Sequence, residues 1–261
     1  MKQEIKDKLP QWYNDLNELD AVITNDIDSL LGYYFIKKKF PNVGVKGFYN
    51  FNEYYNTGSK KKAFGVDLDV IRGRTFGNHI THFYKNPDAI NLNNLYNIKY
   101  YQKYPLNTVL LILSLYDFDL ESFTDEQLKI ILAIDSAHTG YYASNEHFKN
   151  VYTTWLDRLD IRFLEDRILK NMTFADFKAI QNKYNLNGTI EVVNNKLYTN
   201  INLGALSLAL NDIIELPKDS FKKGQTYTYK IIDPMQEAIP DREDIISMAW
   251  TYKDTLKLTL R

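Results

Sequence analysis

The segment Ile23-Thr24-Asn25-Asp26-Ile27-Asp28-Ser29-Leu30-Leu31 places two aspartates between an apolar strand and a helix. Residues 21–24 are apolar or β-branched, as in a short buried strand. Apolar residues at helical spacing follow the aspartates as far as Pro41, which marks the end of the predicted helix. Ligands of open α/β sheets bind at the carboxyl ends of strands, so Asp26 and Asp28 are expected to face a site.

Two carboxylates held this close repel each other. At a separation of about 4 Å and an effective dielectric of about 20, the repulsion is roughly 4 kcal/mol. A divalent cation removes the repulsion, and oxygen-rich sites suit Mg²⁺ or Mn²⁺. Aspartates at the start of a helix also serve as caps and turn formers, so this motif alone leaves both interpretations open.

The arrangement recurs further along the chain. Residues 63–66 predict a short apolar strand that ends in Asp67 and Asp69. Thr124 and Gln127 have the form of a capping box, and the helix that they open runs to Asp135. All four histidines fall between residues 79 and 147, and three of them lie near these acids. The candidate metal site therefore combines recurring aspartates with some of the histidines His79, His82 and His138.

Strands that alternate with helices predict an α/β fold, with a parallel sheet flanked by helices. From residue 186 onward the sequence becomes strand-like, and it begins with a hairpin around Asn194-Asn195. We expect a metal-binding catalytic domain at 1–185 and a smaller, strand-rich α+β module at 186–261. Other predicted elements are strands at 43–48, 226–232, 245–251 and 255–261, helices at 148–159 and from Thr173, a helix or strand at 108–115, and an unassigned stretch at 203–216.

Composition narrows the classes of function. The chain has no cysteine, which excludes disulfides, thiolate zinc sites and a cysteine nucleophile. Its formal net charge of −1 does not suit a dedicated duplex-DNA binder, which usually carries a basic excess. The N-terminal segment lacks the apolar core of a signal peptide, and no apolar run approaches the roughly 20 residues of a membrane helix. We expect a cytoplasmic protein that does not bind membranes.

The order of the motifs resembles that of the DHH phosphoesterase superfamily. This family includes RecJ-type exonucleases, oligonucleotide and cyclic-dinucleotide phosphodiesterases, and family II pyrophosphatases. Asp26-Ile27-Asp28-Ser29 matches its first motif, and Asp67 matches the aspartate that ends its second. Asp135, with Thr139-Gly140-Tyr141 after it, resembles the fourth motif with a short insertion. The resemblance covers about residues 20–145.

The third motif, Asp-His-His, has no match, and its nearest equivalent is Gly77-Asn78-His79. The C-terminal module also lacks the Gly-Gly-Gly-His type of motif by which many relatives hold substrate. The resemblance implies hydrolysis of a nucleotide or short single-stranded nucleic acid by water activated between two Mn²⁺ or Mg²⁺ ions, in a cleft between the modules. The roles that it implies are metal ligands Asp26, Asp28, Asp67 (as the bridge), His79 and Asp135, catalytic histidines His79, His82 and His138, and substrate contacts from Arg72, Arg74 and Asn78.

Two other functions stay open. Asp26-Ile27-Asp28 after a strand also resembles the nucleophile motif of haloacid-dehalogenase-type phosphatases, although Leu30 stands where that motif prefers threonine. The altered third motif also suits a decayed active site that is retained as a binding or scaffold module. Lys37–Lys39 and Lys60–Lys62 are candidates to hold phosphates, or are solvated surface. The sequence does not predict the oligomeric state.

Overall fold

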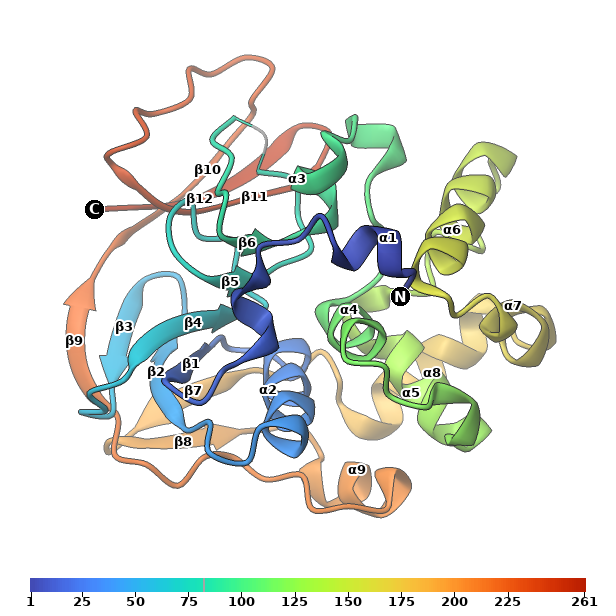
Figure 1. The fold of residues 1–261 in the computed structure, drawn as a ribbon, viewed down its shortest axis with the longest axis horizontal. Coiled ribbons are helices and arrows are strands. Elements are labelled where there is room, and N and C mark those ends of the chain that lie inside the picture. Colours follow the sequence, from blue (N-terminus) through green and yellow to red (C-terminus); the bar gives the residue numbers. More distant parts are fainter. Residues whose placement is uncertain (82) are drawn as a thin grey trace.

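A seven-stranded sheet forms the centre of the protein, in the order β6-β5-β4-β1-β2-β3-β9 (Figure 1). The computed structural model describes residues 1–81 and 83–261. The five strands from β6 to β2 are parallel, and β3 and β9 join antiparallel at one edge. The predicted α/β class is confirmed. The strands of this sheet are β1 (Leu19–Ile23), β2 (Val45–Tyr49), β3 (Glu53–Asn56), β4 (Lys62–Val66), β5 (Thr75–Phe76), β6 (Ala89–Ile90) and β9 (Lys222–Thr226).

The predicted junction between strand and helix at Asp26 is confirmed. β1 is buried along its whole length, and α2 (Ile27–Lys39) begins soon after it with Asp26 as the N-cap. Oδ1 of Asp26 accepts a hydrogen bond from the Ser29 amide at 3.0 Å. Gly32 lets α2 approach β4 closely, because a Cβ there would lie 2.8 Å from Cγ1 of Val66. This close packing fixes the start of α2 relative to the end of β4.

Most of the remaining helices gather on one side of the large sheet (Figure 1). Residues 108–115, for which the sequence allowed helix or strand, form a helix that is buried at all positions. The predicted capping box at Thr124 is present, and the helix predicted from Thr173 also begins with a capping box. The remaining α-helices of the described residues are α1 (Gln3–Lys6), α3 (Leu92–Tyr96), α4 (Thr108–Leu115), α5 (Asp125–Ala133), α6 (Glu146–Leu159), α7 (Phe163–Arg167), α8 (Phe174–Tyr184) and α9 (Leu203–Leu210).

The C-terminal region contributes to all three sheets. The predicted hairpin is present as β7 (Ile190–Val193) and β8 (Lys196–Thr199), and its two turn asparagines have φ of 51° and 63°, as a type I′ turn requires. β9 then extends the large sheet, and only Tyr227 separates it from β10. β10 (Thr228–Ile232), β11 (Ile245–Tyr252) and β12 (Thr255–Leu260) form a three-stranded antiparallel sheet in the order β10-β12-β11.

Buried apolar side chains form one large cluster and two smaller ones. The large cluster runs from Met1 to Phe221 and includes side chains of β7, β8 and α9. The second cluster joins the three-stranded sheet to Ile71 and Ile80, which follow β4 and β5. The domain boundary at residue 186 stays a prediction. The large cluster contains side chains from both sides of it, including several between residues 190 and 221. Among the residues described, no helix has the length and apolarity needed to span a bilayer.

Candidate active site

The carboxyl ends of β1, β2, β4 and β5 surround a cavity of about 390 Å³. Because these strands are parallel, their ends meet at the same edge of the sheet. The segment after α5 reaches the cavity from outside the sheet. Four of the predicted site residues, from four separate segments, are thus brought together. The acidic and histidine side chains that line the cavity are Asp26, Asp67, Asp69, His79 and Asp135, with Asn25, Asn50 and Asn52 beside them.

Asp26 and Asp28 have different surroundings, although one residue separates them. Asp26 lines the cavity. The Asp28 side chain is buried, and its two oxygens accept hydrogen bonds from the amides of Thr108 and Val109, each at 2.8 Å. Amides in the first turn of a helix lack partners within the helix, and a negative charge is favourable there. Asp28 therefore anchors the start of α4, which differs from the metal-ligand role predicted for it.

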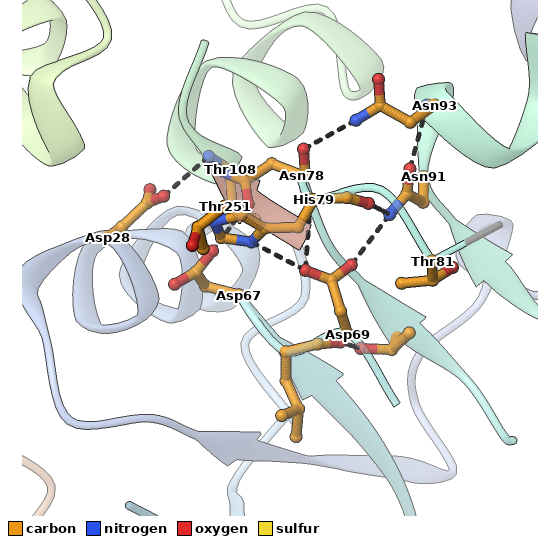
Figure 2. A network of polar contacts seen from close by, with 12 residues as sticks. Asp28, Asp67, Asp69, Asn78, His79, Thr81, Asn91, Asn93, Thr108 and Thr251 are labelled. Atoms are coloured by element: carbon orange, nitrogen blue, oxygen red, sulfur yellow. Dashed lines mark hydrogen bonds and ion pairs between the residues drawn. The ribbon is translucent and has the colours of Figure 1, made fainter. Parts of the chain in front are cut away.

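Asp67 turns the chain immediately after β4. Its φ is 52°, in the left-handed region that aspartate adopts more readily than most residues. Oγ1 of Thr108 donates to Oδ1 of Asp67 at 2.7 Å. The first residue of α4 therefore binds two acids, through its amide to Asp28 and through its hydroxyl to Asp67 (Figure 2).

His79 is held by an aspartate that the sequence did not single out as a site residue. Its Nδ1 lies 2.9 Å from Oδ2 of Asp69, and its amide donates to the same oxygen at 3.2 Å. Asn91, just after β6, donates to Oδ1 of Asp69 and to the His79 carbonyl, each at 2.8 Å (Figure 2). Gly77 makes room for this pair, because a Cβ there would lie 2.0 Å from Oδ1 of Asp69. The histidine ring is therefore fixed in orientation beside the carboxylates.

Asp135 reaches the cavity through an unusual backbone conformation. α5 ends at Ala133, and Asp135 and Ser136 follow with φ of 48° and 54°. Left-handed conformations at residues other than glycine cost of order 1 kcal/mol or more and persist where the surroundings hold them. Asp67 and Asp135, both in this region, line the same cavity.

Burial raises the pKa values of these acids, and repulsion from neighbouring carboxylates adds to the rise for Asp26, Asp28 and Asp67. Burial, with a contribution from the charge of Asp135, raises the pKa of Asp26 to about 6. Burial and the neighbouring carboxylates hold the pKa values of Asp28 and Asp67 well above their ordinary range. Asp135 is surface-accessible, but the protein atoms packed around its carboxyl group raise its pKa as well. The charges of His79, Lys257 and Lys103 and a hydrogen bond from Asn78 oppose this rise. These acids therefore keep their protons to higher pH than ordinary aspartates do.

The three-stranded sheet closes the cavity from the other side and supplies polar groups that the sequence interpretation missed. Lys257 and Thr259 lie on the polar face of β12, and Thr251 lies near the end of β11; all three line the cavity. Nζ of Lys103 donates to the Thr251 carbonyl at 2.7 Å. Burial lowers the pKa of Lys103 to about 8, with the charge of Asp135 opposing the shift. The sequence signal for this polar face was the strict alternation of polar and apolar residues over 255–260. It places the side chain of Lys257 on the opposite face of the strand from those of Leu256 and Leu258.

His138 is not part of this group, which corrects its predicted catalytic role. It is buried, its Nδ1 lies 3.2 Å from the Leu132 carbonyl, and its ring stacks on Phe177 with the centroids 4.3 Å apart. A histidine between a backbone carbonyl and an aromatic ring packs in the core and does not face the cavity. His82, the other predicted catalytic histidine, lies outside the described residues.

The predicted phosphate contacts lie elsewhere. Arg74 and Lys60–Lys62 line a hollow with Leu19, where β1, β4 and β5 begin, which is the edge of the sheet opposite the cavity. Arg72 is exposed, 4.0 Å from Glu243, and Lys37–Lys39 form the last turn of α2. Lys103 and Lys257 are instead the lysines near the acids. Asn78 does lie beside the site, next to His79, and its Oδ1 has no hydrogen-bond partner among the described residues.

The acids suit a hard cation by donor type and charge. Carboxylates are preferred ligands of Mg²⁺ and Mn²⁺, and Asp26, Asp67 and Asp135 line one cavity. Within residues 1–81 and 83–261, however, no group of three or more His, Cys, Asp or Glu side chains is arranged to hold a metal ion as it stands. Coordination of one cation by three or more of these side chains therefore requires some of them to change position.

Comparison with known proteins does not identify a family. No family model matches the chain, and neither the curated proteins nor the solved structures include a significant match to it.

Proposed function

We propose that this chain is a metal-dependent phosphoesterase that hydrolyses phosphodiester bonds in a nucleotide or a short single-stranded nucleic acid, as a divergent relative of the DHH superfamily. The observation that supports it most is the meeting of Asp26, Asp67, His79 and Asp135, from four separate segments, around one cavity. Burial raises the pKa values of the three acids, and neighbouring carboxylates add to the rise for Asp26 and Asp67. Such perturbed groups in a cleft are typical of functional sites.

Asp26, Asp67 and Asp135 are the residues that would hold Mn²⁺ or Mg²⁺, with His79 at the side of the cavity. When bound, such ions offset the carboxylate repulsion and supply activation of water and neutralisation of phosphate charge. Thr108 orients the Asp67 carboxylate through its hydroxyl, and Asp28 holds Thr108 in place through its amide. The start of α4 thus positions a proposed ligand.

His79 is the residue that we propose as proton donor to the departing oxygen. A positioned histidine is the commonest general acid. Here Nδ1 is bound to Asp69, and Nε2, which has no hydrogen-bond partner among the described residues, is the nitrogen that would act on substrate. Asp69 is a positioning residue in this scheme, since it acts through the histidine. Lys257 and Lys103, at the border of the cavity, are suited to bind the substrate phosphate.

Calorimetric titration with Mn²⁺, followed by a screen of phosphodiester substrates, tests the proposal. We expect the wild type to bind Mn²⁺ in the micromolar range or tighter, and Asp67→Asn to lower the affinity at least about tenfold. Asp219→Asn is the matched control, because Asp219 is exposed and lies outside the cavity. A wild type that binds neither Mn²⁺ nor Mg²⁺ would rule out the metal site.

One observation favours a second candidate function, a binding or scaffold module with a decayed site. No preformed metal-holding group is present among the described residues. In that case the protein would bind nucleotides without hydrolysing them, in the presence or absence of divalent cations. Binding without turnover, in a wild-type protein that also fails to bind Mn²⁺, would select this candidate.

A further inference from the structure

A second cavity, of about 450 Å³, adjoins the acid cavity, and its walls are rich in aromatic side chains. His79, Asp135, Thr251 and Lys257 line both cavities, so the two meet at these residues. The volume lies in the usual range for small-molecule sites, about 300–1,000 Å³. The aromatic residues that line it are Tyr100, Tyr101, Tyr104, Phe148 and Tyr252. They come from three separate parts of the chain, which together form one aromatic cleft.

Three of these rings are exposed to solvent. The exposed fraction is 50% for Tyr101, 68% for Tyr252 and 36% for Phe148. Tyr100 provides a fixed wall between them, because its hydroxyl donates to the Thr251 carbonyl at 3.2 Å and its ring packs on Trp250. Exposed rings collected around one hollow mark a binding site more often than scattered single rings do.

Positive charge lies at the end of the aromatic cleft nearest the acids. Lys103 and Lys257 both line it, and Nζ of Lys103 lies 4.8 Å from the centroid of the Tyr100 ring. Nζ of Lys103 donates one hydrogen bond to the Thr251 carbonyl and has two further donors. A ligand that fits this cleft has a flat aromatic part joined to an anionic part, which is the chemistry of a nucleotide.

We infer that the aromatic cleft binds the base of the substrate nucleotide by stacking, with its phosphate directed to Lys103, Lys257 and the acid cavity. This inference rests on the proposed function, because it assigns a subsite for the substrate of the same site. Base–aromatic stacking tolerates any base, so the cleft selects for the presence of a base and not for its identity. The substrate class is therefore a nucleotide or the end of a single strand, and a simple phosphate ester is a poor substrate.

Binding of AMP and of ribose 5-phosphate, measured by calorimetry in Mg²⁺ and again in EDTA, tests this subsite without relying on turnover. The wild type is expected to bind AMP at least about fivefold more tightly than ribose 5-phosphate, since stacking on one base is worth at least that factor. The double variant Tyr101→Ala/Tyr252→Ala is expected to lose that advantage and to bind ribose 5-phosphate as the wild type does. Tyr198→Ala, an equally exposed tyrosine on β8, is the control.

The outcomes separate this inference from the proposed function. Equal affinity of the wild type for AMP and ribose 5-phosphate overturns the subsite, even if the enzyme hydrolyses phosphodiesters. Failure to bind AMP at millimolar concentration under both conditions also overturns it. AMP binding that depends on Tyr101 and Tyr252, without hydrolysis of any substrate, supports the subsite and contradicts the proposed hydrolysis. An unchanged melting temperature in the double variant shows that its fold is intact.

Discussion

His79 is the residue on which catalysis, as proposed, depends most directly. Aspartates alone can hold a cation, but the departing oxygen also needs a proton, and His79 is the histidine that lines the cavity among the residues described. We expect His79→Ala to lower turnover by at least about a hundredfold, the low end of general acid–base effects. Its melting temperature should stay near that of the wild type, because the side chain is only half-buried. Near-normal turnover of His79→Ala would remove the catalytic role.

At the scale of single residues, the sequence predicted three of the acids that line the cavity, Asp26, Asp67 and Asp135, but not Asp69. It failed where the direction of a side chain decides the outcome. Asp26 and Asp67 follow parallel strands directly, so topology alone brings them together. Asp28 lies within the first turn of α2, where the helix directs its side chain to α4. Arg74 precedes its strand, and in a parallel sheet that position lies at the edge opposite Asp67. No local pattern distinguishes a histidine that stacks in the core, as His138 does, from one that faces a cavity.

The start of α4 depends on Asp28, and that dependence can be measured as stability. Asp28→Ala leaves two buried amides, those of Thr108 and Val109, without their acceptor. An unsatisfied buried donor costs about 1–3 kcal/mol, while removal of a buried carboxylate with a raised pKa offsets part of the loss. We expect the free energy of unfolding, measured in urea, to fall by about 2 kcal/mol, and the two amides to exchange faster with solvent. Asp219→Ala should change it by less than about 0.5 kcal/mol; an equal effect of the two variants would contradict this role for Asp28.

Helices and hairpins whose ends are marked by capping or turn residues were predictable from the sequence. The helices that begin at Thr124 and Thr173 carry their capping residues in the chain, and the hairpin carries its Asn194-Asn195 turn. β9 was not predicted as a strand of its own, because all five of its residues are exposed and polar or small, and it forms through pairing with β3. The polar face of β12 was predictable, but its contact with the cavity was not. A polar strand face is expected both where the strand faces solvent and where it faces a polar cavity.

For the molecule as a whole, the acid cluster predicts an unusual dependence of stability on pH. The pKa values of Asp26, Asp28 and Asp67 in the folded protein lie above the ordinary value of 3.8. The folded state therefore binds more protons than the unfolded state above about pH 4, and stability falls as pH rises. The stability that these groups contribute is fully present below about pH 4 and is lost through about pH 6 for Asp26, and at higher pH for the other two.

Thermal melting between about pH 4 and pH 8 checks this expectation. In EDTA, the melting temperature of the wild type should decrease across this range more steeply than that of Asp67→Asn, which lacks one of the repelling charges. Millimolar Mn²⁺ should raise the melting temperature most at the upper end of the range, where the carboxylates are ionised and free to bind the ion. Parallel profiles for the two proteins, with and without Mn²⁺, would show that the carboxylates do not interact as described.

The single residue between β9 and β10 limits how far the three-stranded sheet can move relative to the large sheet. Tyr227 passes from the large sheet to the three-stranded sheet, and its amide is bound to the Asn52 carbonyl at 2.7 Å. Further hydrogen bonds join Met248 to the Asp69 carbonyl and Thr259 to the Phe51 carbonyl. A hinge motion that swung the small sheet away would have to break all of these at once, next to the proposed ligands. A substrate of the proposed reaction is therefore expected to enter and leave through the existing mouths of the two cavities, without an opening of the three-stranded sheet.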